Sequence, residues 1–108
     1  QQIPAPAFQE SRRAEFVLEL FERERLQDVS VDEVGNVYGR WSTDNRPWSI
    51  VHSPSSSPKP LIVSAHLDTV FPAETDLRVR READKVFGPG IGDNSLGVAA
   101  LFGLLWGL

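Results

Sequence analysis

The residues best suited to chemistry are His66 and Asp68, which directly follow the apolar run at residues 61–65. That run is short and partly β-branched, which predicts a buried strand. Side chains two residues apart on an extended chain share a face, so His66 and Asp68 are expected to point the same way. An imidazole held by a carboxylate is typical of a metal-ligating histidine. The pair therefore predicts part of a metal site, and a purely structural histidine is the alternative interpretation.

A second carboxylate, Asp93, ends the glycine-rich loop at residues 88–94, just before a predicted helix. The glycines let the backbone approach another segment closely and aim Asp93 inward, and Asn94 or Ser95 is then expected to cap the helix. The loop lacks the third glycine of a dinucleotide fingerprint and the Gly-Lys-Ser/Thr of a phosphate loop, and the charge of Asp93 would repel phosphate. The competing explanation is a tight turn in which Asp93 is itself the cap. We predict that Asp93 joins His66 in one metal site whose other ligands lie outside this sequence.

Composition narrows the class of protein. The 108 residues, 41% of them apolar, predict one small folded domain rather than a disordered tail. The net charge of −4, with acidic and basic residues interspersed, argues against nucleic acid or an anionic membrane as partner. Cysteine is absent, which excludes disulfides and thiolate metal sites and is compatible with the cytoplasmic location that we predict.

The two ends of the sequence predict a fragment of a longer protein. The first residue is Gln1 rather than methionine, and no signal-peptide pattern follows it. The last run, residues 98–108, stops while it is still apolar and helical in pattern. It is too short to span a bilayer, which takes about 20 apolar residues.

The remaining elements follow from periodicity and turn residues. An apolar stripe of Ala14, Val17, Leu18 and Phe21 predicts a helix over residues 9–27. Short strands are expected at residues 29–34 and 37–41 around a Gly35-Asn36 turn, at 48–51, and at 77–80 and 85–87 around an Ala83-Asp84 turn, with a helix from Leu96. His52 is expected to be exposed and without function. Helices alternating with short strands indicate an α/β layer fold.

Taken together, residues 64–70 and 88–100 resemble one family of zinc-dependent metallopeptidases and deacylases. It contains tripeptide aminopeptidase, glutamate carboxypeptidase, aminoacylase, acetylornithine deacetylase and succinyl-diaminopimelate desuccinylase. Residues 3–6, the first helix and residues 32–37 resemble the N-terminal region of that family, and the glycine loop is most similar to its tripeptide-aminopeptidase branch. The resemblance implies a three-layer zinc-exopeptidase-like α/β catalytic domain. Residues 1–108 would be only its N-terminal part, without the lid or dimerisation domain.

The resemblance also implies a role for each site residue. His66 would ligate one zinc ion, Asp68 would be the catalytic-site carboxylate that holds His66, and Asp93 would bridge two zinc ions. The peptide bond between Asp93 and Asn94 would be cis. Zn2+ is implied at two ions per site, with Co2+ or Mn2+ as alternatives. A glutamate general base and the other ligands would lie outside the 108 residues, which hold two of the five usual zinc-ligand residues.

The implied function is cleavage of the amide bond of a small peptide or N-acyl amino acid by a full-length protein that is a homodimer in many relatives. The 108 residues alone are expected to be inactive and poorly soluble, because apolar strand edges would lack partners. Two other classes of function stay open. One is a non-catalytic metal-binding or interaction module on the same partial fold. The other is a structural domain in which Asp93 only caps a helix.

Overall fold

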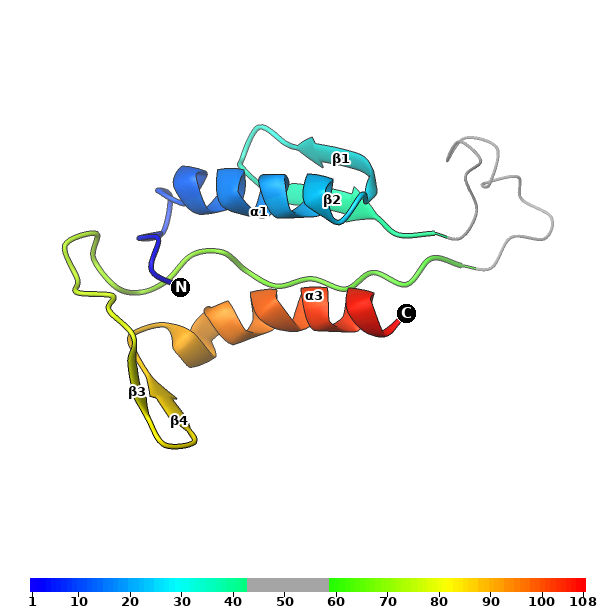
Figure 1. Cartoon of the computed structure of the whole chain (residues 1–108). Helices are drawn as coiled ribbons and strands as arrows, with labels where there is room; N and C mark the ends of the chain where they lie inside the picture. The colour runs from blue at the N-terminus through cyan, green and yellow to red at the C-terminus, as the bar shows by residue number, and fades with distance from the viewer. Residues whose placement is uncertain (43–58) are drawn as a thin grey trace.

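The structure is a computed structural model that describes residues 1–42 and 59–108 (Figure 1). Its helices are α1 (Ser11–Arg23) and α3 (Leu96–Gly107), and its strands are β1 (Gln27–Val31), β2 (Val37–Arg40), β3 (Arg80–Glu82) and β4 (Lys85–Phe87). The strands form two separate antiparallel pairs, β1 with β2 and β3 with β4. The mixed α/β class is confirmed, whereas a full three-layer fold is not seen in the described residues. The predicted strand at residues 48–51 and His52 lie outside them.

Helix α1 forms where the apolar stripe predicts it, with Ala14 and Val17 buried. It ends at Arg23, four residues before the expected end. Arg25 adopts a left-handed conformation with φ of 57°, and the Leu26 N–H donates to the Phe21 carbonyl at 3.1 Å. The chain leaves the helix at this C-terminal turn, so Gln27, the expected last helical residue, begins β1 instead.

The β1–β2 hairpin confirms the predicted turn, at which Gly35 takes a positive φ of 89° that favours glycine. The hairpin contacts α1 closely at Gly39. A Cβ atom at that position would lie 2.8 Å from side-chain atoms of both Phe21 and Leu26. The absence of a side chain at Gly39 therefore lets β2 pack against the end of α1.

The predicted buried strand at residues 61–65 is wrong for the described chain. The segment is extended but pairs with no described strand, and Leu61 and Ile62 are each 86% exposed. The chain that follows it forms a single parallel bridge, between Thr69 and Pro6. An apolar, β-branched segment favours the extended conformation, but a β-strand also needs a neighbouring strand with which to form hydrogen bonds. The described residues supply no such strand beside residues 61–65.

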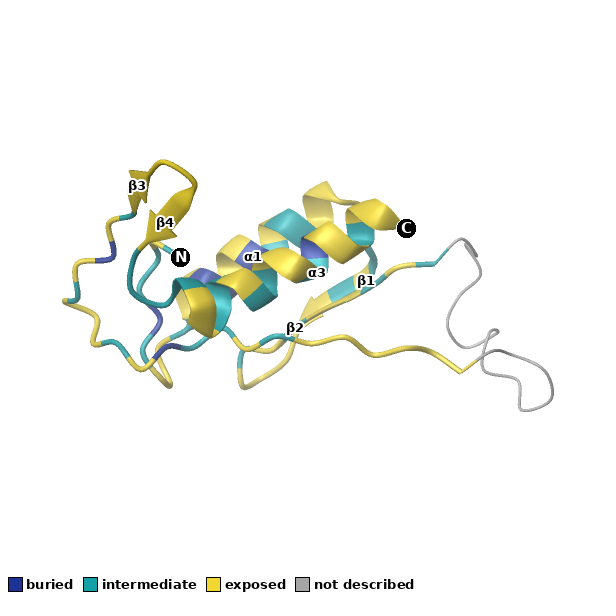
Figure 2. Cartoon of the chain, turned by 90° about the horizontal axis from the view of Figure 1, so that it is seen from below, coloured by how far each residue is buried: buried dark blue, intermediate teal, exposed yellow. Residues whose placement is uncertain are grey.

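The hydrophobic core of the described residues is thin. Its buried apolar side chains are Ala5, Ala14, Val17, Leu77 and Phe102. Helices α1 and α3 meet where the rings of Phe21 and Phe102 lie 5.6 Å apart. Helix α3 is apolar on all sides yet largely exposed, with Trp106 at 69% (Figure 2). A helix apolar all round is typical of a buried position, so self-association through this surface stays a prediction.

The β3–β4 hairpin projects away from the other elements in both views (Figures 1 and 2), and all its strand residues are exposed. The predicted turn at Ala83-Asp84 is confirmed. The first strand begins at Arg80, later than the expected start at Leu77. Leu77 is buried and exposure alternates along residues 77–80 as predicted, although pairing with β4 begins only at Arg80.

Candidate metal centre

His66 has a carboxylate at each ring nitrogen. Its Nδ1 lies 3.0 Å from Asp68 Oδ1, and its Nε2 lies 2.9 Å from Asp93 Oδ1. The structure therefore brings together all three predicted site residues, although Asp93 is 27 positions from His66 in the sequence. A neutral imidazole donates from one nitrogen only, so both hydrogen bonds require the doubly protonated ring.

The centre is open to solvent, with side-chain exposures of 51% for His66, 44% for Asp68 and 76% for Asp93. Desolvation is the largest single influence and lowers the pKa of His66, but the hydrogen bonds to Asp68 and Asp93 and their negative charges together outweigh it, so the pKa is raised overall. Two carboxylates facing one imidazole leave an excess of negative charge whichever way the ring is protonated. The arrangement therefore favours a cation at the point where Nε2 and Asp93 meet.

The turn η1 (Ile91–Ser95) aims Asp93 at His66. It starts after Gly90, whose φ of 71° is left-handed, and it closes through a hydrogen bond from the Ser95 N–H to the Gly90 carbonyl at 3.2 Å. Within it, Asp93 and Asn94 leave the helical conformation, with φ values of −126° and −134°. The Asp93–Asn94 peptide is cis, as the family resemblance implies.

The predicted helix caps are wrong. Ser95 occupies the N-cap position of α3 but makes no side-chain capping hydrogen bond. The Asn94 amide instead donates from Nδ2 to the His66 carbonyl at 3.4 Å. A Cβ atom at Gly97 would overlap the Asn94 side chain, so the glycine makes room for it. The Asn94 side chain thus lies over the first turn of α3 at Gly97 and joins the glycine loop to the histidine segment through the His66 carbonyl.

Arg13, which was not predicted as a site residue, contacts the main chain of the centre. Its Nη1 donates to the Leu67 carbonyl at 2.6 Å, between His66 and Asp68. One feature of the sequence could have identified Arg13 as a buried residue. It is a charged residue four positions before Val17, so it lies on the face of α1 that the apolar stripe buries.

The donors present fit part of a zinc site. Two ligands of one tetrahedral zinc, each about 2.0–2.2 Å from the ion, lie about 3.3–3.6 Å apart. The 2.9 Å between His66 Nε2 and Asp93 Oδ1 is a few tenths of an ångström shorter, as a hydrogen bond in place of the ion requires. A catalytic zinc needs about three protein ligands. The described residues contain no group of three or more His, Cys, Asp or Glu side chains that could hold a metal.

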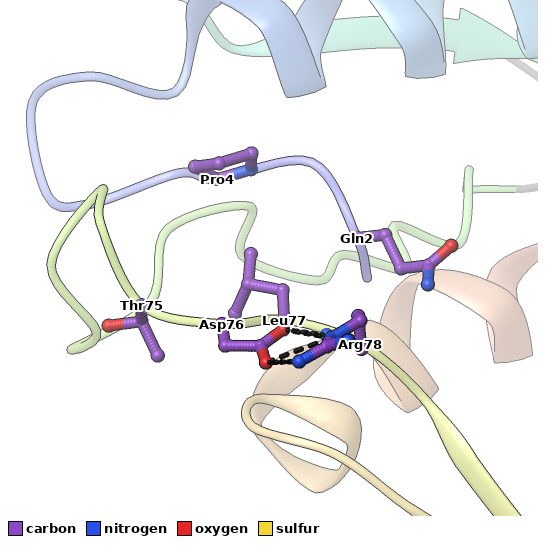
Figure 3. A pocket seen from close by; sticks show the side chains of 6 residues that line it. All are labelled: Gln2, Pro4, Thr75, Asp76, Leu77 and Arg78. Atoms are coloured by element: carbon purple, nitrogen blue, oxygen red, sulfur yellow. Dashed lines mark hydrogen bonds and ion pairs between the residues drawn. The ribbon is translucent and has the colours of Figure 1, made fainter.

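A hollow of about 340 Å³ between the N-terminal segment and residues 75–78 is separate from this centre (Figure 3). Its charged lining residues are Asp76 and Arg78, which pair with each other at 2.7 Å. Hydrogen bonds from Arg78 lower the pKa of Asp76, and the same contacts raise the pKa of Arg78. Because each charge already has its partner and both are largely exposed, this hollow offers no comparable chemistry.

An imidazole held between two carboxylates, on a partial α/β fold, is the kind of cation centre that metallohydrolases use. Residues 36–108 match the model of peptidase family M28, and this range contains all three predicted site residues. Because the match covers more than half of the sequence, the chain belongs to peptidase family M28. No curated protein matches the chain in a sequence comparison.

Family membership sharpens the expectation drawn from the sequence. M28 is a family of zinc aminopeptidases, so the metallopeptidase part of that expectation is confirmed, and the deacylases named with it are not specifically supported. The family implies that the full-length protein is a metallohydrolase, and its enzymes typically use co-catalytic zinc. No described helix has the length and apolar character needed to cross a membrane.

Proposed function

We propose that this chain supplies one side of a co-catalytic zinc centre with which the full-length protein cleaves the amide bond of small peptides, as a tripeptide aminopeptidase does. The observation that carries the proposal is the placement of His66 between Asp68 and Asp93 at 3.0 and 2.9 Å. Membership of family M28 supports it, because peptide substrates and zinc are properties of that family.

Each side chain has a distinct task in the proposed centre. Asp68 accepts a hydrogen bond from the Nδ1–H group of His66. This contact fixes the tautomer and leaves the Nε2 lone pair for zinc. Asp93 offers two oxygens and could therefore bridge two ions. When bound, zinc would polarise the scissile carbonyl and lower the pKa of a shared water to about 7. His66 must give up its Nε2 proton first, because proton and metal compete for the same lone pair.

Hydrolysis of N-acyl amino acids is the second substrate class that we carry forward. The two classes differ at the amino end of the substrate, which is a free cationic amine in a tripeptide and a neutral acyl group in an N-acyl amino acid. Hydrolysis rates for a tripeptide, the same tripeptide with an acetylated amino end, and an N-acyl amino acid would distinguish them. We expect the unblocked tripeptide to be cleaved fastest, and fastest cleavage of the acylated compounds would indicate a deacylase.

The direct test is zinc content and peptide hydrolysis in the full-length protein and its His66→Ala variant. We expect the variant to lose bound zinc and more than about 100-fold in activity, since even residues that only orient a metal ligand typically contribute 10–100-fold. Asp84→Ala, which removes an exposed carboxylate at the β3–β4 turn, is the matched control and should behave as wild type.

A His66→Ala variant with unchanged zinc and activity would contradict the proposal. A wild-type protein that binds zinc through these residues without hydrolysing any peptide would instead indicate the non-catalytic metal-binding module. The use of Co2+ or Mn2+, a homodimeric assembly and a cytoplasmic location remain predictions.

A further inference from the structure

Arg13 is the only charged side chain that is buried within residues 1–42 and 59–108, with 6% of its surface exposed. It projects from the face of α1 that also carries Ala14 and Val17. Removing a guanidinium from water is strongly unfavourable unless hydrogen bonds replace the lost solvent. The contacts that Arg13 makes in return therefore show what its burial achieves.

Those contacts are to main-chain carbonyl groups. Nη1 donates to the Leu67 carbonyl at 2.6 Å, and Nη2 donates to the carbonyls of Ile3 at 2.5 Å and Gln1 at 3.4 Å. None of the ion pairs among the described residues includes Arg13. A planar guanidinium with donors in fixed directions is well suited to set the relative positions of several acceptors. Arg13 thus joins α1, the N-terminal segment and the histidine segment.

The hydrogen bond to the Leu67 carbonyl fixes the main chain between His66 and Asp68. This carbonyl belongs to the peptide that joins Leu67 to Asp68, and Leu67 is the one residue between His66 and Asp68. The orientation of this peptide therefore affects how both side chains project from the backbone. Neither of these side chains is held by burial, because both are about half exposed. Their geometry must therefore come from the main chain, and Arg13 provides its nearest buried anchor.

A second anchor lies two residues further along. Thr69 is buried, and its N–H donates to the Ala5 carbonyl at 2.7 Å. Ala5 belongs to the same N-terminal segment that Arg13 binds through Ile3. The histidine segment is therefore fixed on both sides of Asp68, once by a side chain from α1 and once by the parallel bridge.

Charge acts in the same direction as these hydrogen bonds. Burial lowers the pKa of Arg13, and the nearby negative charge of Asp68 opposes that change. The two opposite charges attract each other, which stabilises the histidine segment against α1.

We propose that Arg13 is a positioning residue that holds the Leu67 carbonyl and thereby presents His66 and Asp68 to the metal. This inference rests on the proposed function, because it assigns Arg13 a task in the same centre. It also extends the centre beyond residues 36–108, since Arg13 precedes the part of the chain that matches the family.

The test uses the full-length protein with Arg13→Met, which keeps an unbranched stem that can pack in the same place and removes the charge and the donors. Co2+ affinity and the visible absorption spectrum of the Co2+ form report the ligand geometry. We expect Co2+ to bind about 10–100-fold more weakly, as for other residues that orient a metal ligand, with a changed spectrum. Hydrogen exchange in the metal-free protein should be faster at the Thr69 amide. Arg12→Met, at an exposed neighbour on α1, is the matched control and should change none of these.

Arg13→Lys is the second variant, and it provides the same measurement if Arg13→Met does not fold. A single ammonium cannot replace a fork that contacts Leu67 and Ile3 together, so we expect a folded variant with intermediate Co2+ affinity. Wild-type affinity in whichever variant folds would overturn the inference. So would a lower melting temperature with an unchanged spectrum and affinity, because Arg13 would then have only a structural role.

His66→Ala separates failure of this inference from failure of the proposed function. If His66→Ala loses Co2+ while Arg13→Met retains wild-type affinity, the positioning role is wrong and the centre stands. If His66→Ala also retains Co2+, the proposed metal centre itself is wrong.

Discussion

The turn of the β1–β2 hairpin and the candidate metal centre each have one side chain with several close polar partners, Asp32 in the turn and His66 in the centre. They differ in what those partners are. Asp32 accepts four hydrogen bonds, from Val34, Asn36 and Tyr38, and all the donors are neutral. His66 instead faces two carboxylates. The first group is complete in itself, whereas the second has more acceptors and negative charge than its one imidazole can satisfy. An aspartate surrounded by neutral donors indicates a structural turn, and an imidazole between carboxylates indicates a place for a cation.

Removal of Asp93 should have the largest effect. Asp93→Ala in the full-length protein deletes the proposed bridging ligand, so we expect loss of bound zinc and more than about 100-fold lower peptidase activity. Metal analysis and steady-state kinetics are the measurements. Asp32→Ala is the matched control at the hairpin and should retain zinc and activity. Equal loss in both variants would remove the distinction between the two regions.

Asp68 should matter less, because it acts through His66. Asp68→Asn keeps the size of the side chain but weakens the acceptor for the Nδ1 proton, and we expect a 10–100-fold loss of zinc affinity. Titration of the metal-free protein with zinc would measure it. An affinity within about twofold of wild type would show that Asp68 does not orient His66.

Two glycines with positive φ allow the regions to be compared directly. Gly35 has φ of 89° and Gly90 has φ of 71°, so alanine at either should destabilise the fold by about 1–2 kcal/mol through backbone strain. We expect only Gly90→Ala to weaken zinc binding as well, because Gly90 starts the turn that carries Asp93. Thermal unfolding and zinc titration of both variants would check this, and weaker zinc binding in Gly35→Ala would contradict it.

The smallest effect concerns acid stability. Hydrogen bonding from Asn36 is the main reason that the pKa of Asp32 lies below its ordinary value of 3.8. Ionised Asp32 therefore contributes stability above pH 3.8, and that contribution is lost as the pH falls through its lower folded pKa. Asp32→Asn should slightly lower the melting temperature near neutral pH. The difference from wild type should shrink at more acidic pH, and a difference that persists there would contradict the assignment.

Local features were predictable from the sequence because their determinants are local. The stripe of Ala14 and Val17 identified α1, and Gly35 identified the hairpin turn. The end of α1 was wrong because a left-handed Arg25 terminates the helix, and residue type alone does not predict that conformation there. The strand at residues 61–65 was wrong because strand pairing depends on a neighbour that the segment itself does not encode.

The candidate site was predictable in part for the same reasons. His66 and Asp68 were expected to share a face from their spacing alone, and the structure places them so. Convergence with Asp93 was predicted from its place at the end of the glycine loop, whereas the cis peptide after it was implied only by the family resemblance. Arg13 and Asn94 escaped prediction because both act on main-chain carbonyls, and such contacts leave no motif in the sequence.

The most direct test of the central claim is an anomalous diffraction map of the full-length protein crystallised with zinc. We expect a zinc peak about 2.0–2.2 Å from both His66 Nε2 and a carboxylate oxygen of Asp93, with Asp68 still hydrogen-bonded to Nδ1. Zinc bound elsewhere, with His66 and Asp93 still hydrogen-bonded directly to each other, would contradict it.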